Sequence, residues 1–263
     1  MSSLSLAVRD SGTMLRRNLL HARRYPSLTL NLLLTPVMLL LLFVYIFGDT
    51  MSAGIGDGGG GRAAYIAYIV PGILMMTIGS TVVGTAVSVS TDMTEGIIAR
   101  FRTMAIHRGS VLVGHVIGSV LQAVASVVLV GAVGVAIGFR SVDATAVEWL
   151  AAFGLLVLFS LALTWIAVGM GLVSPNAEAA GNSAMPLILL PLLSSAFTPL
   201  DSMPGWFRPV AEYQPFTPAI ETLRGLLLGT GIGNSGWLAA GWCLGLTVLG
   251  YLWATARFNG GTK

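Results

Sequence analysis

The charged residues divide this chain into long apolar windows. Between Arg24 and Asp49 lie 24 uncharged residues. Further uncharged windows cover 63–91, 109–139, 149–177, 179–200 and 225–256. A helix that crosses a bilayer needs about 20 mostly apolar residues, so each window holds one span. The pattern predicts six transmembrane helices near 28–47, 65–90, 111–138, 149–172, 182–200 and 237–256.

The composition agrees with an all-α integral membrane protein. Of 263 residues, 55% are hydrophobic and only 10% are charged, whereas soluble domains carry about 25% charged residues. The basic residues gather near the ends of the spans, so binding to nucleic acid is a poor explanation of the net charge of +3. Cys243 is the only cysteine, which excludes an internal disulfide and a cysteine-based metal site.

The first residues form a polar, basic segment that does not resemble a cleaved signal peptide. Leucine and valine recur there near helical spacing beside arginines, at Leu4, Val8, Leu15 and Leu19. We predict an interfacial helix in a cytoplasmic segment 1–27, followed by a transmembrane domain 28–256 and a cytoplasmic tail 257–263. The alternative is a solvated basic tail.

Positive charge sets the orientation of short-loop membrane proteins. With six spans, ten basic residues fall on one side: Arg9, Arg16, Arg17, Arg23, Arg24, Arg100, Arg102, Arg108, Arg257 and Lys263. Four fall on the other side, Arg62, Arg140, Arg208 and Arg224. Both termini are therefore predicted to be cytoplasmic, in the cell membrane.

The fifth span contains Pro186, Pro191 and Pro199. Proline removes a backbone donor and kinks a helix, so we expect a bent helix inside the protein. The stretch 201–236 follows it on the outer side. We predict two short, partly embedded helices there, 203–212 and 218–228.

Local signals mark the outer hairpin in detail. Thr217 precedes Pro218 and is predicted to cap the second helix, with Glu221 in its first turn. Trp206 suits the membrane interface. An outer gate is predicted from five residues: Pro204, Trp206, Pro215, Glu221 and Arg224.

Catalytic signals are missing from the sequence. There is no phosphate loop of the G-x-x-x-x-G-K-[ST] kind and no metal or nucleophile motif, so we expect neither an enzyme nor a resident cofactor. The predicted spans carry no Asp, Glu, Lys or Arg, and His115, near the start of the third span, is predicted to be a packed or interfacial histidine. Asn31, Gln122 and Asn182 either line a translocation path or form hydrogen bonds between helices.

The segment 91–108 joins the second and third predicted spans. Thr91 is predicted to cap a short helix, and an apolar strip lies beside basic residues. Such a helix serves as a lever for a partner, or rests on lipid headgroups. The residues predicted to couple to a partner through this helix are Asp92, Glu95, Gly96, Arg100, Phe101 and Arg102.

Two stretches resemble a known family. The stretch 91–102 resembles the cytoplasmic coupling loop of type-2 ABC exporter membrane subunits, in particular the daunorubicin/doxorubicin-resistance permeases. The stretch 199–224, with Met203-Pro204-Gly205-Trp206 and Gln214-Pro215-Phe216-Thr217-Pro218, resembles that family's outer hairpin. At Ala105-Ile106-His107 relatives often have a proline.

The resemblance implies a permease dimer, with a homodimer expected, bound to two copies of a separate cytoplasmic ATPase that carries ATP and magnesium. The cargo would be an amphipathic drug or antibiotic that passes outward between the permeases. Three alternatives stay open: export of a lipid or glycan precursor of the cell envelope, an unpowered channel or carrier, and a membrane enzyme. An ATPase encoded next to this chain would favour the exporter.

Overall fold

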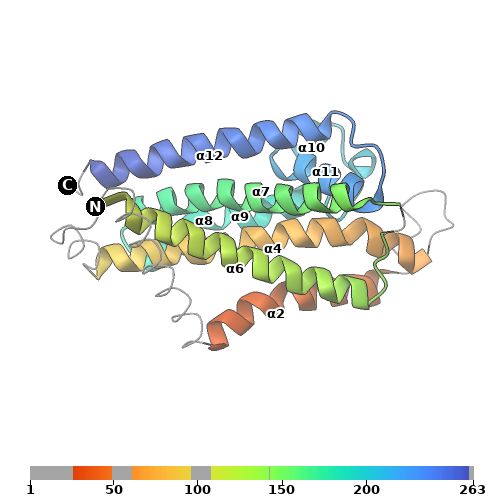
Figure 1. Cartoon of the computed structure of the whole chain (residues 1–263), viewed down its shortest axis with the longest axis horizontal. Helices are drawn as coiled ribbons and strands as arrows, with labels where there is room; N and C mark the ends of the chain where they lie inside the picture. The colour runs from red at the N-terminus through yellow and green to blue at the C-terminus, as the bar shows by residue number, and fades with distance from the viewer. Residues whose placement is uncertain (1–25, 49–60, 96–107, 142, 261–263) are drawn as a thin grey trace.

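The computed structural model is all-helical and describes residues 26–48, 61–95, 108–141 and 143–260. Among these residues, four helices are long and apolar enough to cross a membrane. They are α4 (Gly61–Thr94), α6 (Arg108–Ala136), α7 (Ala146–Val173) and α12 (Ser235–Asn259). They run along the long axis of the molecule (Figure 1). These helices cover the stretches where spans are expected near 65–90, 111–138, 149–172 and 237–256.

The first expected span is also helical. Helix α2 (Pro26–Leu42) continues into a π-helix, η1 (Phe43–Phe47). The expected interfacial helix at 4–24 lies outside the described residues.

The fifth expected span is a broken segment, by which we mean residues 177–199. It consists of α8 (Ala177–Ala184), α9 (Pro186–Leu189), the 3-10 helix η3 (Leu190–Leu193) and turns. The predicted bend is confirmed, and the helical elements, which cover 177–193 with a turn at Met185, begin and end earlier than the expected span 182–200. The helix begins earlier because Asn176 caps it, accepting a hydrogen bond from the Ala179 amide at 2.8 Å. Residues 194–199 are not helical.

The hairpin, residues 200–229, contains η4 (Leu200–Ser202), α10 (Arg208–Tyr213) and α11 (Phe216–Leu228). The expected helix 203–212 therefore begins five residues late. The expected cap at Thr217 is wrong, because α11 starts at Phe216 and Thr217 lies inside it. Consequently Glu221 does not lie in the first turn. Helix α11 ends at Gly229, as expected, with a left-handed φ of 68°.

The bundle has two distinct ends (Figure 1). The hairpin end holds α10, α11 and the starts of α4, α7 and α12. The loop end holds the end of α4 and the start of α6. Helix α7 starts with a capping box, in which Thr145 accepts from the Glu148 amide and Glu148 accepts from the Thr145 amide.

Helix α4 is the centre of the fold. Its apolar window is 72% buried, against 22% for that of α12. It packs against α6, α7, α8 and α11. Close approach depends on glycine: a Cβ at Gly79 would stand 2.4 Å from the Leu187 carbonyl oxygen, and one at Gly169 of α7 would stand 2.3 Å from the Trp253 ring. Small residues allow helices to approach closely in membranes.

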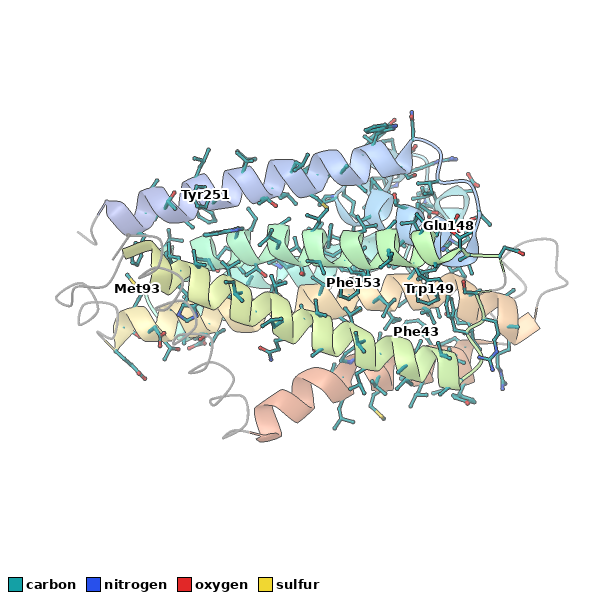
Figure 2. All side chains as sticks on the ribbon, viewed as in Figure 1. Phe43, Met93, Glu148, Trp149, Phe153 and Tyr251 are labelled. Carbon is teal, nitrogen blue, oxygen red and sulfur yellow. The ribbon has the colours of Figure 1, made fainter. Side chains whose placement is uncertain are left out.

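The outer surface of the bundle is apolar. Large hydrophobic side chains are exposed on α6, α7 and α12, among them Leu121, Phe153 and Leu252. Figure 2 shows Trp149 and Phe153 on α7 and Tyr251 on α12. An exposed apolar surface of this extent indicates contact with lipid or with another protein.

Candidate functional sites at the two ends of the bundle

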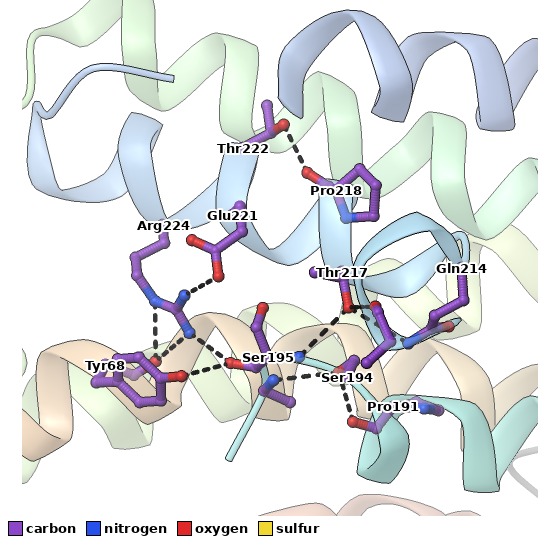
Figure 3. Close-up of polar contacts among 12 residues, drawn as sticks. Tyr68, Pro191, Ser194, Ser195, Gln214, Thr217, Pro218, Glu221, Thr222 and Arg224 are labelled. Carbon is purple, nitrogen blue, oxygen red and sulfur yellow. Dashed lines mark hydrogen bonds and ion pairs between the residues drawn. The ribbon is translucent and has the colours of Figure 1, made fainter. Parts of the chain in front are cut away.

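Arg224 is the centre of a polar network at the hairpin end (Figure 3). Its Nε and Nη2 donate to the Tyr68 carbonyl at 3.3 and 3.1 Å, and Nη2 also donates to the Ser195 carbonyl at 3.0 Å. Its Nη1 donates to Glu221 at 2.7 Å. The guanidinium carbon lies 3.9 Å from the centre of the Tyr68 ring. Since this side chain is only 11% exposed, the arginine holds α4, α11 and the broken segment together from inside.

The backbone of Ser195, in the turn of the broken segment, is hydrogen-bonded to three side chains. Its carbonyl accepts from Arg224 and, at 2.9 Å, from the Tyr68 hydroxyl. Its amide donates to the Thr217 hydroxyl at 3.3 Å. The same hydroxyl donates to the Ala211 carbonyl at 2.5 Å, at the end of α10. We call Tyr68, Ser195, Thr217 and Arg224 the clamp.

Two carbonyls just before the turn also accept hydrogen bonds from side chains. Gln214 Nε2 donates to the Leu190 carbonyl at 3.2 Å, and Ser194 Oγ donates to the Pro191 carbonyl at 2.5 Å. Prolines deprive the segment of helical donors. Backbone groups left free in this way are tolerated at membrane depth only where protein satisfies them. Side chains of the hairpin, of α4 and of the segment itself therefore satisfy backbone groups of the broken fifth span.

Aromatic rings join the first helix to this turn. Phe43 of η1 lies against Phe197, with ring centres 4.7 Å apart. The guanidinium of Arg62 lies 5.4 Å from the centre of the Tyr45 ring. A π-helix often marks a functional position in a helix, and this one faces the broken segment.

The five predicted gate residues do not form one cluster. Pro204 and Trp206 lie on the exposed rim of the hairpin, where Trp206 is 80% exposed. Glu221 and Arg224 belong to the polar network, and Pro215 directly precedes α11. Sequence reasoning missed Tyr68 and Ser195. The signals were a tyrosine close to Pro71 inside an apolar window and a serine pair after Pro191.

A second polar site lies at the loop end. His115 Nε2 on α6 lies 3.0 Å from Asp92 Oδ2 on α4, and these side chains are 5% and 11% exposed. Asp92 lies beyond the span expected near 65–90, in the last turn of α4, which continues to Thr94. His115 is packed, as expected, but the sequence did not identify its partner. Deeper along the same two helices, the hydroxyls of Thr85 and Ser119 are hydrogen-bonded.

The predicted coupling residues are only partly described. Asp92 and Glu95 lie at the end of α4, and Glu95 is exposed. Gly96, Arg100, Phe101 and Arg102 lie outside the described residues. The expected cap at Thr91 is wrong, because Thr91 lies in the last turn of α4 and donates to the Val87 carbonyl.

The predicted path residues lie on three helices, and the structure does not bring them together. The side chain of Asn31 lies outside the described residues. Gln122 on α6 is half-buried and Asn182 on α8 is exposed. In the part of the chain that the structure describes, neither side chain is hydrogen-bonded to another helix. The described residues also contain no cluster of three metal-ligating side chains.

Comparisons with known proteins agree with this architecture. The family model of the ABC-2 type transporter matches residues 10–228. The chain is 28% identical to the daunorubicin resistance ABC transporter permease protein DrrB1 of Streptomyces coeruleorubidus, over 85% of this chain and 77% of that protein. It is 21% identical to the probable doxorubicin resistance ABC transporter permease protein DrrC of Mycobacterium tuberculosis, over 79% of this chain and 72% of that protein. The chain therefore belongs to the ABC-2 type transporter family, as a non-catalytic multi-pass membrane permease subunit that works with a separate ATPase.

Proposed function

We propose that this chain forms the translocation path of an ATP-driven exporter for an amphipathic drug or antibiotic. The observation that carries the proposal is the likeness to a daunorubicin resistance permease over 85% of the chain. The permease acts as a homodimer bound to two copies of the ATPase. The cargo moves outward between the two copies.

The proposal includes six spans, with α2 and η1 as the first and the broken segment as the fifth. The loop end and both termini face the cytoplasm, which the ten-to-four distribution of basic residues supports. Single cysteines at Ser3 and Asn259, in a variant that lacks Cys243, test this orientation. Neither should react with an impermeant thiol reagent in intact cells, and labelling of either would contradict the orientation.

Residues 91–108 receive the push of the ATPase in this proposal. Glu95 is exposed at the end of α4, where a partner can reach it. Glu95→Lys and Arg100→Glu should leave ATP hydrolysis in place and reduce export, because partner contacts depend on complementary charge. Export and hydrolysis, measured together in membranes with matched expression, test the role. Unchanged coupling in both variants would exclude these residues from transmission.

The hairpin forms the outer gate in this proposal. Trp206 and Pro204 are exposed on its rim, while Arg224 anchors its base to α4. Trp206→Ala should reduce export and retain binding of the ATPase, because this residue stands far along the bundle from the loop end. Loss of ATPase binding by a folded Trp206 variant would contradict the assignment.

The decisive experiment is transport by the purified complex. The permease is reconstituted in vesicles with its ATPase, and doxorubicin movement is followed with and without ATP. ATP-dependent accumulation on the side of the hairpin is expected. Transport of a lipid-linked glycan in place of doxorubicin would favour the envelope-precursor alternative, and doxorubicin flux without the ATPase would favour a channel.

A further inference from the structure

The ends of α4 and α6 that flank the coupling segment are joined by side chains. Asp92 lies in the last turn of α4, and His115 lies two turns into α6. Their contact of 3.0 Å is buried in the protein. Buried polar side chains in proteins are paired, and this pair joins α4 and α6 directly.

A second contact continues the same seam. Thr85 lies seven residues before Asp92 on α4, and Ser119 lies four residues after His115 on α6. The two contacts therefore follow one interface between antiparallel helices, deeper into the bundle. Two other buried hydroxyls on these helices bond to their own backbone: Thr81 donates to the Thr77 carbonyl and Ser126 to the Gln122 carbonyl. Polar bonds between α4 and α6 are thus concentrated toward the loop end.

The contact between α7 and α12 is of another kind. Trp253 packs over Gly169, and a Cβ at Gly250 would stand 2.8 Å from the Trp165 Cβ. Packing of this kind depends on shape alone. The polar contacts between α4 and α6 also fix how the two helices are aligned, because a carboxylate and an imidazole can form a hydrogen bond at one register only.

We infer that Asp92 and His115 form a latch, which makes the cytoplasmic ends of α4 and α6 move as one body. This inference rests on the proposed role of residues 91–108 in coupling. A push on a segment that joins two independent helices would separate their ends. The latch prevents that separation and passes the displacement along α4, which contacts the clamp through Tyr68 at its other end. Asp92 and His115 are positioning residues, since they act through the helices that they join.

The first test measures the latch without any substrate. Spin labels are placed at Thr94→Cys and Val113→Cys, both exposed, in a Cys243→Ala permease bound to its ATPase. The distance between the labels should be the same before and during ATP turnover. With Asp92→Ala or His115→Ala added, the distance distribution should broaden or shift during turnover. A distribution unaffected by both variants, or one that already shifts without them, would overturn the latch.

The second test measures coupling. Asp92→Ala and His115→Ala should each lower the drug exported per ATP hydrolysed at least ten-fold, with the complex still assembled. Asp92→His combined with His115→Asp should recover at least half of the wild-type ratio, because the swapped pair restores the contact. Ser126→Ala is the matched control on α6 and should leave the ratio unchanged.

The outcomes separate the latch from the function. If the wild-type complex exports no amphipathic drug, the proposed function fails, whereas the label distances still decide on the latch. If a single alanine variant does not fold, Asp92→Leu or His115→Phe, which keeps the side-chain volume and removes the polar contact, replaces it in both tests. Export that falls in the single variants and is not recovered in the swapped pair would overturn the latch.

Discussion

The two ends of α4 use polar side chains in different ways. At the hairpin end, Arg224, Tyr68 and Thr217 bond to the backbone of a segment whose helix is interrupted. At the loop end, Asp92 bonds to His115, and the two side chains come from continuous helices, α4 and α6. The first network is a condition for the fold, because a broken backbone has no other donors in lipid. The second joins two helices that would each form without it.

This difference predicts how the two ends respond to mutation. Changes in the clamp should lower stability first and export as a consequence. Changes in the latch should lower the export obtained per ATP before they lower stability. Stability is followed below as the midpoint of thermal aggregation of detergent-solubilised permease, together with the yield of monodisperse protein.

Arg224→Ala is expected to have the largest effect. A hydrogen bond from a charged group contributes about 1.5–3 kcal/mol, and this side chain makes several. We expect a loss of roughly 3 kcal/mol or more, and little monodisperse protein. Arg224→Lys should recover only part, because an ammonium lacks the planar fork that reaches two carbonyls.

The matched control for Arg224 is Arg208→Ala in the same hairpin. Arg208 pairs with Asp201 at 2.8 Å, but these side chains are 47% and 84% exposed. Exposed pairs contribute little, so the aggregation midpoint should hardly change. Equal losses in the two variants would show that positive charge on the hairpin, and not the clamp, stabilises this end.

Gly79→Ala is expected to have the next largest effect. The added Cβ would meet the Leu187 carbonyl oxygen at 2.4 Å, which is backbone and cannot rotate away. Forcing atoms into a packed interior costs about 1–3 kcal/mol. Gly84→Ala is the control on the same helix, since nothing lies within 4 Å of its Cβ. It should be neutral or stabilising by up to about 1 kcal/mol, and a loss there as large as at Gly79 would refute the close-approach explanation.

Thr217→Val should also lower the aggregation midpoint, by less than Gly79→Ala does. Valine keeps the shape but removes the hydroxyl, so the Ser195 amide and the Ala211 carbonyl lose a partner. Leaving buried groups unsatisfied costs about 1–3 kcal/mol. Thr222→Val on the same helix removes only a bond to its own Pro218 carbonyl and should change the midpoint little. If both variants behave alike, the turn does not depend on Thr217.

Much of the fold could be predicted from the sequence because helices in lipid need long apolar windows. The helices extend past the windows, however, since a charged residue such as Arg62 or Asp92 does not end a helix. The prolines predicted the break in the fifth span. They could not predict which side chains bond to the broken segment, because Tyr68 lies 127 residues from Ser195 in the sequence. Local capping rules likewise assigned Thr217 to a helix start, whereas its hydroxyl bonds to distant backbone.

Glu221→Ala is expected to have the smallest effect, and it tests the comparison most directly. Placed in the first turn, Glu221 would have stabilised α11 through the helix dipole, but the helix starts at Phe216 and the carboxylate instead accepts from Arg224 at 2.7 Å. Its side chain is 35% exposed, so water screens the pair, and we expect a loss of roughly 0.5 kcal/mol or less. The carbonyls of Tyr68 and Ser195 would still hold the guanidinium in place. If Glu221→Ala destabilised the permease as strongly as Arg224→Ala, the ion pair would be the main support of the hairpin. Both ends of α4 would then depend on one side-chain pair, and the distinction between a clamp that maintains the fold and a latch that transmits movement would be lost.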